Sequence, residues 1–246
     1  MNWLKAFAGL CFLAAIGALI AQPSGEKCLG EFVTSMKGRT KNQAHNATLA
    51  MSKLAHVVVP PHGEFSFNKA VGTYTRDAGF RKAPVSYNGQ LLEGWGGGVC
   101  QSSTTLYNAA LLSGMQIVQR SRHRYAPLYA PPGRDAAVAY PNIDLVFRNP
   151  YDFPVTIRGR WVGERLIAGI YANGHTVESP RIVSRLLDKV DPATVALSPT
   201  TARGHVRNSG KAGFNVAVFR EWNNRRELIS RDEYPAMAKV VEYFGN

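Results

Sequence analysis

Apolar residues recur at helical spacing in two stretches of this 246-residue chain. Within residues 42–55 they fall every three or four positions, which predicts a helix. That helix should end before Pro60 and Pro61, because proline disfavours helical geometry in the residue that precedes it. The second stretch begins at Cys100 and ends near Gly114, a residue type that commonly follows a helix C-terminus.

Short apolar runs bounded by turn residues predict several strands. Residues 83–87 and 91–92 flank Asn88-Gly89, a strong signal for a hairpin turn. Further strands are expected, in chain order, in seven runs: 115–120, 136–140, 143–147, 153–161, 166–171, 213–220 and 227–230. The predicted fold class is therefore α+β. It combines a helix plus a β-hairpin, a central helix starting at Cys100, an antiparallel β meander, and a small C-terminal β appendage.

The N-terminal residues have the composition of an export segment. Lys5 supplies a positive charge, and residues 6–21 are all apolar or glycine, a run shorter than the roughly 20 residues of a membrane-spanning helix. Leu19 stands where a cleavage site prefers a small residue, so both a cleaved signal peptide and an uncleaved membrane tether stay open. We expect an exported, extracytoplasmic protein with four parts: 1–21 as signal peptide or anchor, 22–37 as a leader, 38–175 as the main domain and 176–246 as a β-rich C-terminal region.

The chain is strongly basic. It contains 29 basic and 17 acidic residues, which gives a formal net charge of +12. Such an excess favours polyanionic surroundings. The basic residues are scattered, and neither an aromatic-interleaved basic stripe nor a nucleic-acid-binding motif accompanies them. We therefore expect no nucleic-acid partner, and instead a cell-wall peptide or an anionic envelope polymer.

Three consecutive glycines, Gly96-Gly97-Gly98, stand just before Cys100. Glycine is costly inside a helix, so the run predicts a turn that delivers Cys100 to a helix N-terminus. Free amide hydrogens and the positive end of the helix macrodipole would stabilise a thiolate there, and the small glycines would leave room for a substrate. The alternative is that Cys100 is a small buried apolar residue, as free cysteines commonly are.

The same stretch resembles the signature of a known family. Gly97-Gly98-Val99-Cys100-Gln101, followed by residues 103–110, is similar to the motif of the VanW family, which is named after an accessory protein of vancomycin-resistance clusters. Other motifs of that family follow in order and bring the resemblance to roughly residues 38–175: 63–68, Arg120, His123, 132–136, 142–145 and Asn149. Some members are proposed to be cysteine-dependent L,D-transpeptidases that crosslink peptidoglycan. The resemblance implies that Cys100 stands at their motif cysteine.

Nucleophilic thiol catalysis needs a base within hydrogen-bond reach and a group that orients the base. His123 follows Cys100 by one predicted helix and one predicted strand, and Asp144 comes later. This order is comparable to that of papain-like and transglutaminase-like folds. Asp135 is the competing orienter. The alternatives are a surface histidine in a cationic segment for His123 and an ion pair with a nearby arginine for Asp144.

A substrate site beside the cysteine would be formed by the glycine run and by polar residues of the helix. We expect it to contain Gly96, Gly97, Gly98, Gln101, Thr104, Tyr107 and Asn108. The Gln101 side chain, or the amides of Gly97 and Gly98, would donate hydrogen bonds to an oxyanion. The serines and threonines that follow Cys100 are expected to cap the helix.

No metal or cofactor is expected, because Cys-x-x-Cys and His-x-x-x-His spacings are absent and no Gly-Lys-Ser/Thr follows the glycines. A Cys28–Cys100 disulfide is the structural alternative to a free thiol. Three functions stay open. The first is a cell-envelope thiol acyl transferase that acts on peptidoglycan stem peptides and is L,D-transpeptidase-like. The second is a non-catalytic envelope-binding module linked to glycopeptide resistance, and the third is an accessory protein whose cysteine is only part of the core.

Overall fold

The computed structural model describes residues 25–87, 90–197, 204–222 and 224–243. The predicted export segment and the Asn88-Gly89 turn lie outside the described residues. In the part of the chain that is described, no helix is both long enough and apolar enough to cross a membrane.

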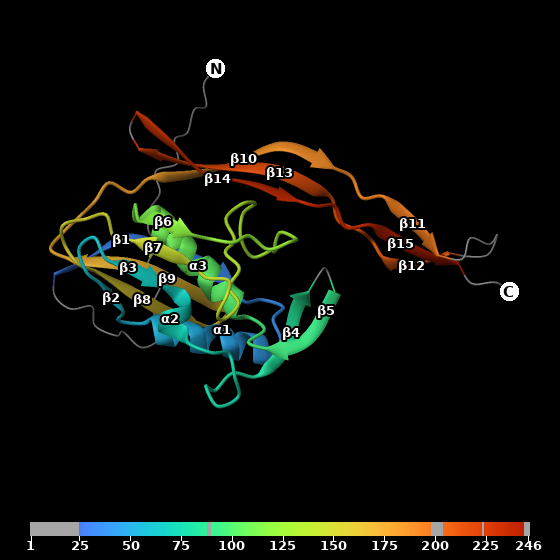
Figure 1. Cartoon of the computed structure of the whole chain (residues 1–246), viewed down its shortest axis with the longest axis horizontal. Coiled ribbons are helices and arrows are strands. Elements are labelled where there is room, and N and C mark those ends of the chain that lie inside the picture. The colour runs from blue at the N-terminus through green and yellow to red at the C-terminus, as the bar shows by residue number, and fades with distance from the viewer. Residues whose placement is uncertain (1–24, 88–89, 198–203, 223, 244–246) are drawn as a thin grey trace, which may run out of the picture.

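A four-stranded antiparallel sheet, in the order β1-β9-β8-β2, lies in the main body (Figure 1). Its strands are β1 (Glu26–Ser35), β2 (Val58–Val59), β8 (Val155–Val162) and β9 (Arg165–Asn173). The register of β1 against β9 runs from Glu26 opposite Asn173 to Ser35 opposite Arg165. The expected leader over residues 22–37 is therefore largely an edge strand. It is ordered because apolar residues such as Leu29 pack into the core.

Both predicted helices are present, and a short one lies between them: α1 (Lys41–Leu54), α2 (Phe67–Val71) and α3 (Val99–Leu112). A capping box begins α1, since the Thr40 hydroxyl accepts from the Gln43 amide at 3.2 Å and the Gln43 side chain accepts from the Thr40 amide at 3.1 Å. Helix α3 packs against β1, β9 and α1 and is buried on almost every side. The helix that carries Cys100 is therefore the centre of the core.

The strands around these helices only partly follow the predicted meander. The hairpin is confirmed as β4 (Lys82–Tyr87) and β5 (Gln90–Trp95). A separate three-stranded sheet, in the order β3-β7-β6, contains β3 (Glu64–Ser66), β6 (Gln116–Gln119) and β7 (Val146–Arg148). The prediction of a single antiparallel meander was wrong. Residues 136–140 form only isolated bridges, and β7 pairs in a different sheet from β8 and β9.

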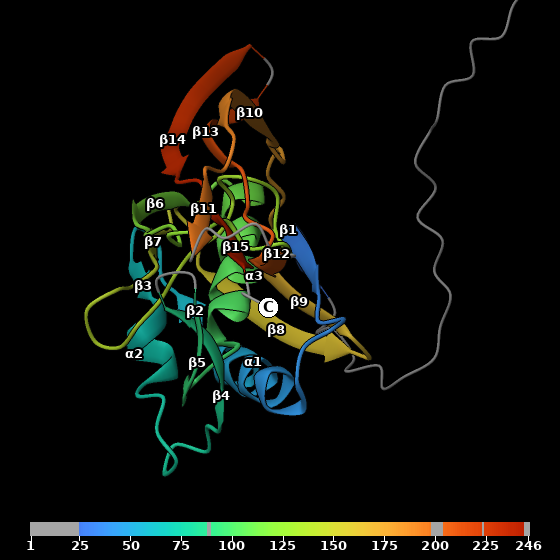
Figure 2. The ribbon, with the colours of Figure 1, turned by 90° about the vertical axis from the view of Figure 1, so that its right-hand side faces the viewer.

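The C-terminal strands form an elongated layer beside the main body (Figures 1 and 2). One sheet has the order β10-β13-β14 and the next has the order β11-β15-β12. Their bounds are β10 (Arg181–Val190), β11 (Thr194–Leu197), β12 (Gly204–Asn208), β13 (Gly213–Trp222), β14 (Arg225–Tyr234) and β15 (Lys239–Tyr243). The predicted pairing of residues 213–220 with 227–230 is confirmed as β13 with β14.

The first of these C-terminal sheets is joined to the main body by buried contacts. The Arg220 side chain donates to the main-chain oxygen of Met115 at 2.7 Å. A Cβ added at Gly133 would meet Val218 at 2.6 Å and Val216 at 3.0 Å, so the chain around Gly133 runs tightly against β13. These contacts bring the β10-β13-β14 sheet to the loop that carries Asp135.

Candidate functional site

Cys100 is the second residue of α3, after the N-cap Gly98 and the first helical residue Val99. Gly98 has a φ of +108°, and no side chain caps the helix. The thiol is half-buried against the main chain of Val138, with Sγ 3.4 Å from the carbonyl oxygen and 3.5 Å from the amide nitrogen. The expected capping by the following serines and threonines was wrong, because these residues lie inside α3 and bond to main-chain oxygens elsewhere, as Ser102 does to Ala47.

One amide of the first turn of α3 lacks an acceptor in the part of the chain that the structure describes. A helix begins with N–H groups that find no acceptor in the helix itself. Val99 donates to the Gly96 oxygen and Gln101 donates to the Gly98 oxygen, each at 3.0 Å. Within the described ranges, the Cys100 N–H has no acceptor. It is therefore a donor beside the thiol, at the positive end of the helix macrodipole.

His123 is fixed by Asp135 through two hydrogen bonds. Its Nδ1 lies 2.6 Å from Oδ2 of Asp135, and its main-chain N–H donates to the same oxygen at 2.7 Å. With Nδ1 engaged in this way, Nε2 is the ring nitrogen left for the hydrogen bond that lowers the pKa of the Cys100 thiol. Cys100, His123 and Asp135 are thus brought together in the order thiol, imidazole, carboxylate.

The second carboxylate oxygen of Asp135 is held by residues that sequence reasoning did not assign to the site. Arg120 Nη2 lies 3.2 Å from Oδ1, and the Tyr234 hydroxyl donates to the same oxygen. Arg120 Nη1 reaches on to Oδ1 of Asp232 at 2.6 Å. Asp135 is 1 % exposed and Tyr234 is 2 % exposed. Two partners in this network, Asp232 and Tyr234, come from β14 of the C-terminal sheet.

The pKa shifts of the three groups are consistent with an ion pair between Cys100 and His123 in the free protein. Burial raises the pKa of Cys100, but the hydrogen bond and charge of His123 outweigh it and lower that pKa. Burial lowers the pKa of His123, but the bonds to Asp135 and the thiolate raise it to about 10. Burial raises the pKa of Asp135, and His123 and Arg120 together lower it to about 2. The arrangement therefore favours thiolate, imidazolium and carboxylate.

Asp144, the other predicted orienter, lies elsewhere. It accepts from the Ser66 hydroxyl at 2.5 Å and from the Asn68 amide at 2.9 Å. It thereby binds the first turn of α2 to the chain that enters β7. The structure does not bring Asp144 to His123, because both carboxylate oxygens are engaged at α2.

The glycine run packs against other parts of the protein on the side where a substrate was expected. A Cβ at Gly97 would stand 2.6 Å from the Pro84 oxygen, and one at Gly98 would stand 2.2 Å from the Gln43 oxygen. At Gly96 it would meet the Tyr74 side chain at 2.7 Å. The space that the missing side chains leave is thus filled by α1, β4 and Tyr74.

The four helix residues expected to bind substrate are buried and engaged inside the protein. Gln101 donates to the Ser35 oxygen at 2.9 Å, and its amide is therefore not free for an oxyanion. Thr104 exchanges hydrogen bonds with the main chain of Ala136 at 3.0 and 3.2 Å. Asn108 bonds to Arg134, and Tyr107 lies under the Arg120 guanidinium, whose carbon is 5.5 Å from the ring centroid. Thr104 and Asn108 thus fix the loop on either side of Asp135.

Cys28, the other cysteine in the described residues, is free like Cys100. It lies on β1 with part of the residue exposed, and the partial burial of its thiol and the neighbouring Glu31 raise its pKa. Among the described residues, the Cys28 and Cys100 thiols are thus not linked to each other, and they differ in charge environment. The hydrogen bond and charge of His123 lower the pKa of Cys100, whereas the pKa of Cys28 is raised.

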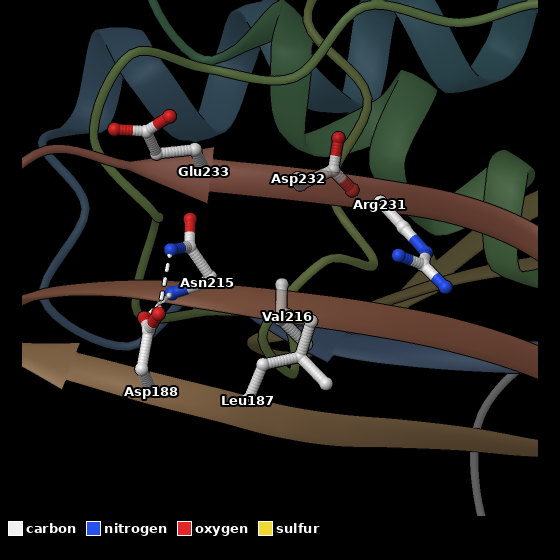
Figure 3. A pocket seen from close by; sticks show the side chains of 7 residues that line it. All are labelled: Leu187, Asp188, Asn215, Val216, Arg231, Asp232 and Glu233. Carbon is white, nitrogen blue, oxygen red and sulfur yellow. Dashed lines mark hydrogen bonds between the residues drawn. The ribbon is translucent and has the colours of Figure 1, made fainter.

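Two cavities lie near these elements. One of about 330 Å³ is lined by Ser35, Lys37, Gly38, Arg39, Leu128 and Tyr129. Tyr129 also connects it to α3, because its phenol bonds to the side chain of Thr104, one helical turn after Cys100. Burial and the Cys100 charge raise the pKa of that phenol. The other, of about 230 Å³, lies on the C-terminal sheet (Figure 3) and includes Asp232, but none of Cys100, His123 and Asp135.

Known proteins share much of this chain. The Bacillus subtilis protein YoaR is 39% identical over 167 residues, which cover 66% of this chain and 55% of YoaR, so the chain spans just over half of that relative. The vancomycin B-type resistance protein VanW of Enterococcus faecalis is 28% identical over 184 residues, which cover 67% of each protein.

Among solved structures, the G5 domain of IgA1 protease is matched over 28% of this chain and 95% of that domain, with 19% identity and a TM-score of 0.19. A second G5-domain structure is matched over 27% of this chain and 93% of its own, with 17% identity and a TM-score of 0.18. The family model described as VanW like protein matches residues 42–171, which is more than half of the chain, and the protein therefore belongs to the VanW family.

Proposed function

We propose that this protein is an exported cell-envelope acyl transferase that uses Cys100 as its nucleophile. The observation that carries the proposal is the line from the Cys100 thiol through His123 to Asp135, in which the His123 Nδ1 lies 2.6 Å from the carboxylate. A thiol, a base in reach and a group that orients the base are the parts that nucleophilic thiol catalysis requires. Asp135, rather than Asp144, is the orienting group in this proposal.

Acylation would begin from the thiolate–imidazolium pair. The Cys100 thiolate attacks the carbonyl carbon of a peptide bond, and the carbonyl oxygen becomes an oxyanion. The unpartnered N–H of Cys100 is suited to donate to that oxyanion. The carbon–nitrogen bond then breaks, the leaving amine takes the proton from His123, and the acyl group remains on Sγ as a thioester.

Transfer would reverse these roles. His123, now neutral, accepts a proton from an incoming amine or water as that nucleophile attacks the thioester carbon. The carbon–sulfur bond breaks, and Cys100 leaves as the thiolate beside the imidazolium. An amine acceptor yields a new peptide bond and water yields hydrolysis, so both outcomes conserve atoms and electrons.

A peptidoglycan stem peptide is the acyl donor that we propose. Its support is membership of a family with a relative named as a vancomycin B-type resistance protein, together with a net charge of +12 that suits an anionic wall. The predicted export segment, residues 1–21, would bring the protein to this substrate.

Alkylation of Cys100 by iodoacetamide against pH tests the proposal, with Cys11 and Cys28 replaced by serine. Because the pKa of Cys100 is lowered and that of His123 is raised to about 10, the labelling rate should be high and nearly constant from neutral pH up to about pH 10. It should fall only when acid protonates the thiolate. An ordinary thiol, with a pKa of about 8.5, is only a few per cent ionised at pH 7.

The matched pair of variants is His123→Ala and His62→Ala. His62 also bonds to an aspartate, Asp152, at 2.8 Å, but on the surface. His123→Ala should slow labelling at pH 7 by about tenfold or more, whereas His62→Ala should leave the rate unchanged. A wild-type thiol that reacts only above about pH 8 would reject catalysis and favour the envelope-binding function.

A further inference from the structure

The cavity bounded by Lys37, Arg39 and Tyr129 has chemistry that the proposed reaction does not yet use. It is about 330 Å³ in volume and lies where the chain leaves β1 for α1. Its lining combines a cationic wall, Lys37 and Arg39, with the Leu128-Tyr129 segment. Leu128 is 95 % exposed, so it offers an apolar surface at the rim.

Arg39 is held in a fixed place relative to the thiol. Its Nε donates to Oε1 of Gln101 at 2.9 Å, and Gln101 follows Cys100 in the first turn of α3. The guanidinium carbon lies 4.8 Å from the centroid of the Tyr129 ring, a cation–π distance. Since Nε and the ring face are the contacts that orient it, the two terminal nitrogens of Arg39 are left to form a planar fork for an anion.

The two cations of this wall, Lys37 and Arg39, have no acidic partner in the described part of the chain. Other exposed arginines do pair, as Arg148 does with Glu64 and Arg160 with Glu31, each at 2.7 Å or less. Cations without acidic partners are common in a chain of net charge +12, but these two line one cavity together with Leu128 and Tyr129. Their charges therefore add at a single concave place on the surface.

Tyr129 links the cationic wall to the reacting sulfur. The Tyr129 phenol bonds to the side chain of Thr104 in α3, and burial together with the Cys100 charge raises its pKa. Thr104 lies one helical turn after Cys100 on α3, and Gln101, which holds Arg39, directly follows Cys100 in the chain. The cavity therefore lies beside the end of α3 that carries the thiol.

We propose that this cavity is a carboxylate-binding subsite, and that the acyl donor carries a carboxylate close to the carbonyl that Cys100 attacks. This inference rests on the proposed acyl-transfer function. The Arg39 fork and Lys37 would bind the carboxylate, and Leu128 would contact the hydrocarbon part of the donor. Peptides whose carboxylates are amidated would be poorer donors for this protein.

The test separates binding from thiol chemistry by using the Cys100→Ser chain. N-acetylglycine and its neutral counterpart N-acetylglycinamide are titrated into the labelled protein, and amide chemical shifts are followed by NMR. The carboxylate should bind at least about fivefold more tightly than the amide, with the largest shifts at Gly38, Arg39 and Tyr129. Adding Arg39→Gln should remove this preference, whereas the matched control Lys53→Gln, which removes an exposed charge of α1, should keep it.

Equal binding of the two probes, absence of shifts at these residues, or a preference that survives Arg39→Gln would each overturn the subsite. None of these results depends on thiol reactivity, so the subsite can fail while Cys100 labels rapidly. Conversely, an inert thiol together with Arg39-dependent carboxylate binding would reject the reaction and leave an anion-binding site.

Discussion

The two ends of the candidate site are held by different forces. At the Cys100 end, main chain packs on main chain: Gly97 lies against β4, and Gly98 lies against the Gln43 carbonyl of α1. At the Asp135 end, a buried network of charged and polar side chains holds the residues in place, and Arg120 lies between Asp135 and Asp232. The first end tolerates no added atom, whereas the second depends on charge and hydrogen bonding.

The two ends also differ in where their parts come from. All the residues that enclose the glycine turn fall within or next to the family match at 42–171. The Asp135 end needs Asp232 and Tyr234, both from β14 and both beyond that match. The comparison teaches that Cys100, His123 and Asp135 all come from the family domain, while the C-terminal sheet holds the Asp135 carboxylate in place.

The largest effect is expected at the close-packed end, from Gly98→Val. Its Cβ would overlap the Gln43 oxygen, at 2.2 Å, in a backbone conformation that β-branched residues avoid. Urea unfolding should show a loss of more than about 3 kcal/mol, or no folded protein at all. The control is Gly163→Val, which has a φ of +56° but nothing within 4 Å, and it should cost only about 1–2 kcal/mol. Equal losses in both variants would refute close packing as the cause.

The next effect is expected at the charged end, from Asp135→Asn compared with Asp144→Asn. Without the Asp135 charge, the pKa of His123 should fall from about 10 toward its ordinary range, and the ion pair with Cys100 should be lost at neutral pH. Iodoacetamide labelling at pH 7 should slow by about tenfold or more in Asp135→Asn. Asp144→Asn should destabilise α2 by about 1–2 kcal/mol while Cys100 labels as in the wild type. If Asp144→Asn slows labelling as much, Asp135 is not the orienter.

The smallest effect is expected from Tyr234→Phe, a variant that tests whether β14 influences the pKa of the Cys100 thiol. The Tyr234 hydroxyl donates to Asp135, so without it more of the Asp135 negative charge should act on Cys100 and raise the thiol pKa. The acid limb of the labelling profile should move up by about half a pH unit, which corresponds to about 0.7 kcal/mol.

Tyr171→Phe is the matched control for that shift. Tyr171 donates to Glu31 at 2.9 Å in the sheet of the main body, so it should lose a similar hydrogen bond and about 1 kcal/mol of unfolding free energy. Its labelling profile should stay in place. Identical profiles for Tyr234→Phe and the wild type would show that β14 only supports the fold.

Local pattern predicted the parts of this fold that depend on short-range periodicity. The helix after Cys100 and the hairpin around Asn88-Gly89 follow from spacing and turn residues alone. Strand β1 was missed, because its Gly/Ser/Pro-flanked sequence is paired only by β9, which lies far along the chain. The meander was predicted as one sheet because sequence order does not say which strands share hydrogen bonds.

The site shows the same limit. Chain order alone pointed to Cys100, His123 and two alternative aspartates, and it could not choose between Asp135 and Asp144, because the choice depends on which loop folds over α3. Three polar residues of α3 have the character of binding residues in the sequence: Gln101, Thr104 and Asn108. In the structure each is buried, and its side chain forms a hydrogen bond with a segment distant in the chain. Asp232 and Tyr234 carried no signal, since nothing local distinguishes them from other polar strand residues.

The span between Asp135 and Tyr234 has a consequence for the order of folding. The two residues are 99 positions apart, and β1 pairs with β9 across a still longer stretch of chain, from Glu26 opposite Asn173 to Ser35 opposite Arg165. As the polypeptide emerges from its N-terminus, Cys100, His123 and Asp135 are all present well before β14 exists. Long-range contacts of this kind form late. The nascent chain therefore carries an incompletely supported thiol site, and the thiol acquires its full environment only when β14 has folded back onto the Asp135 loop.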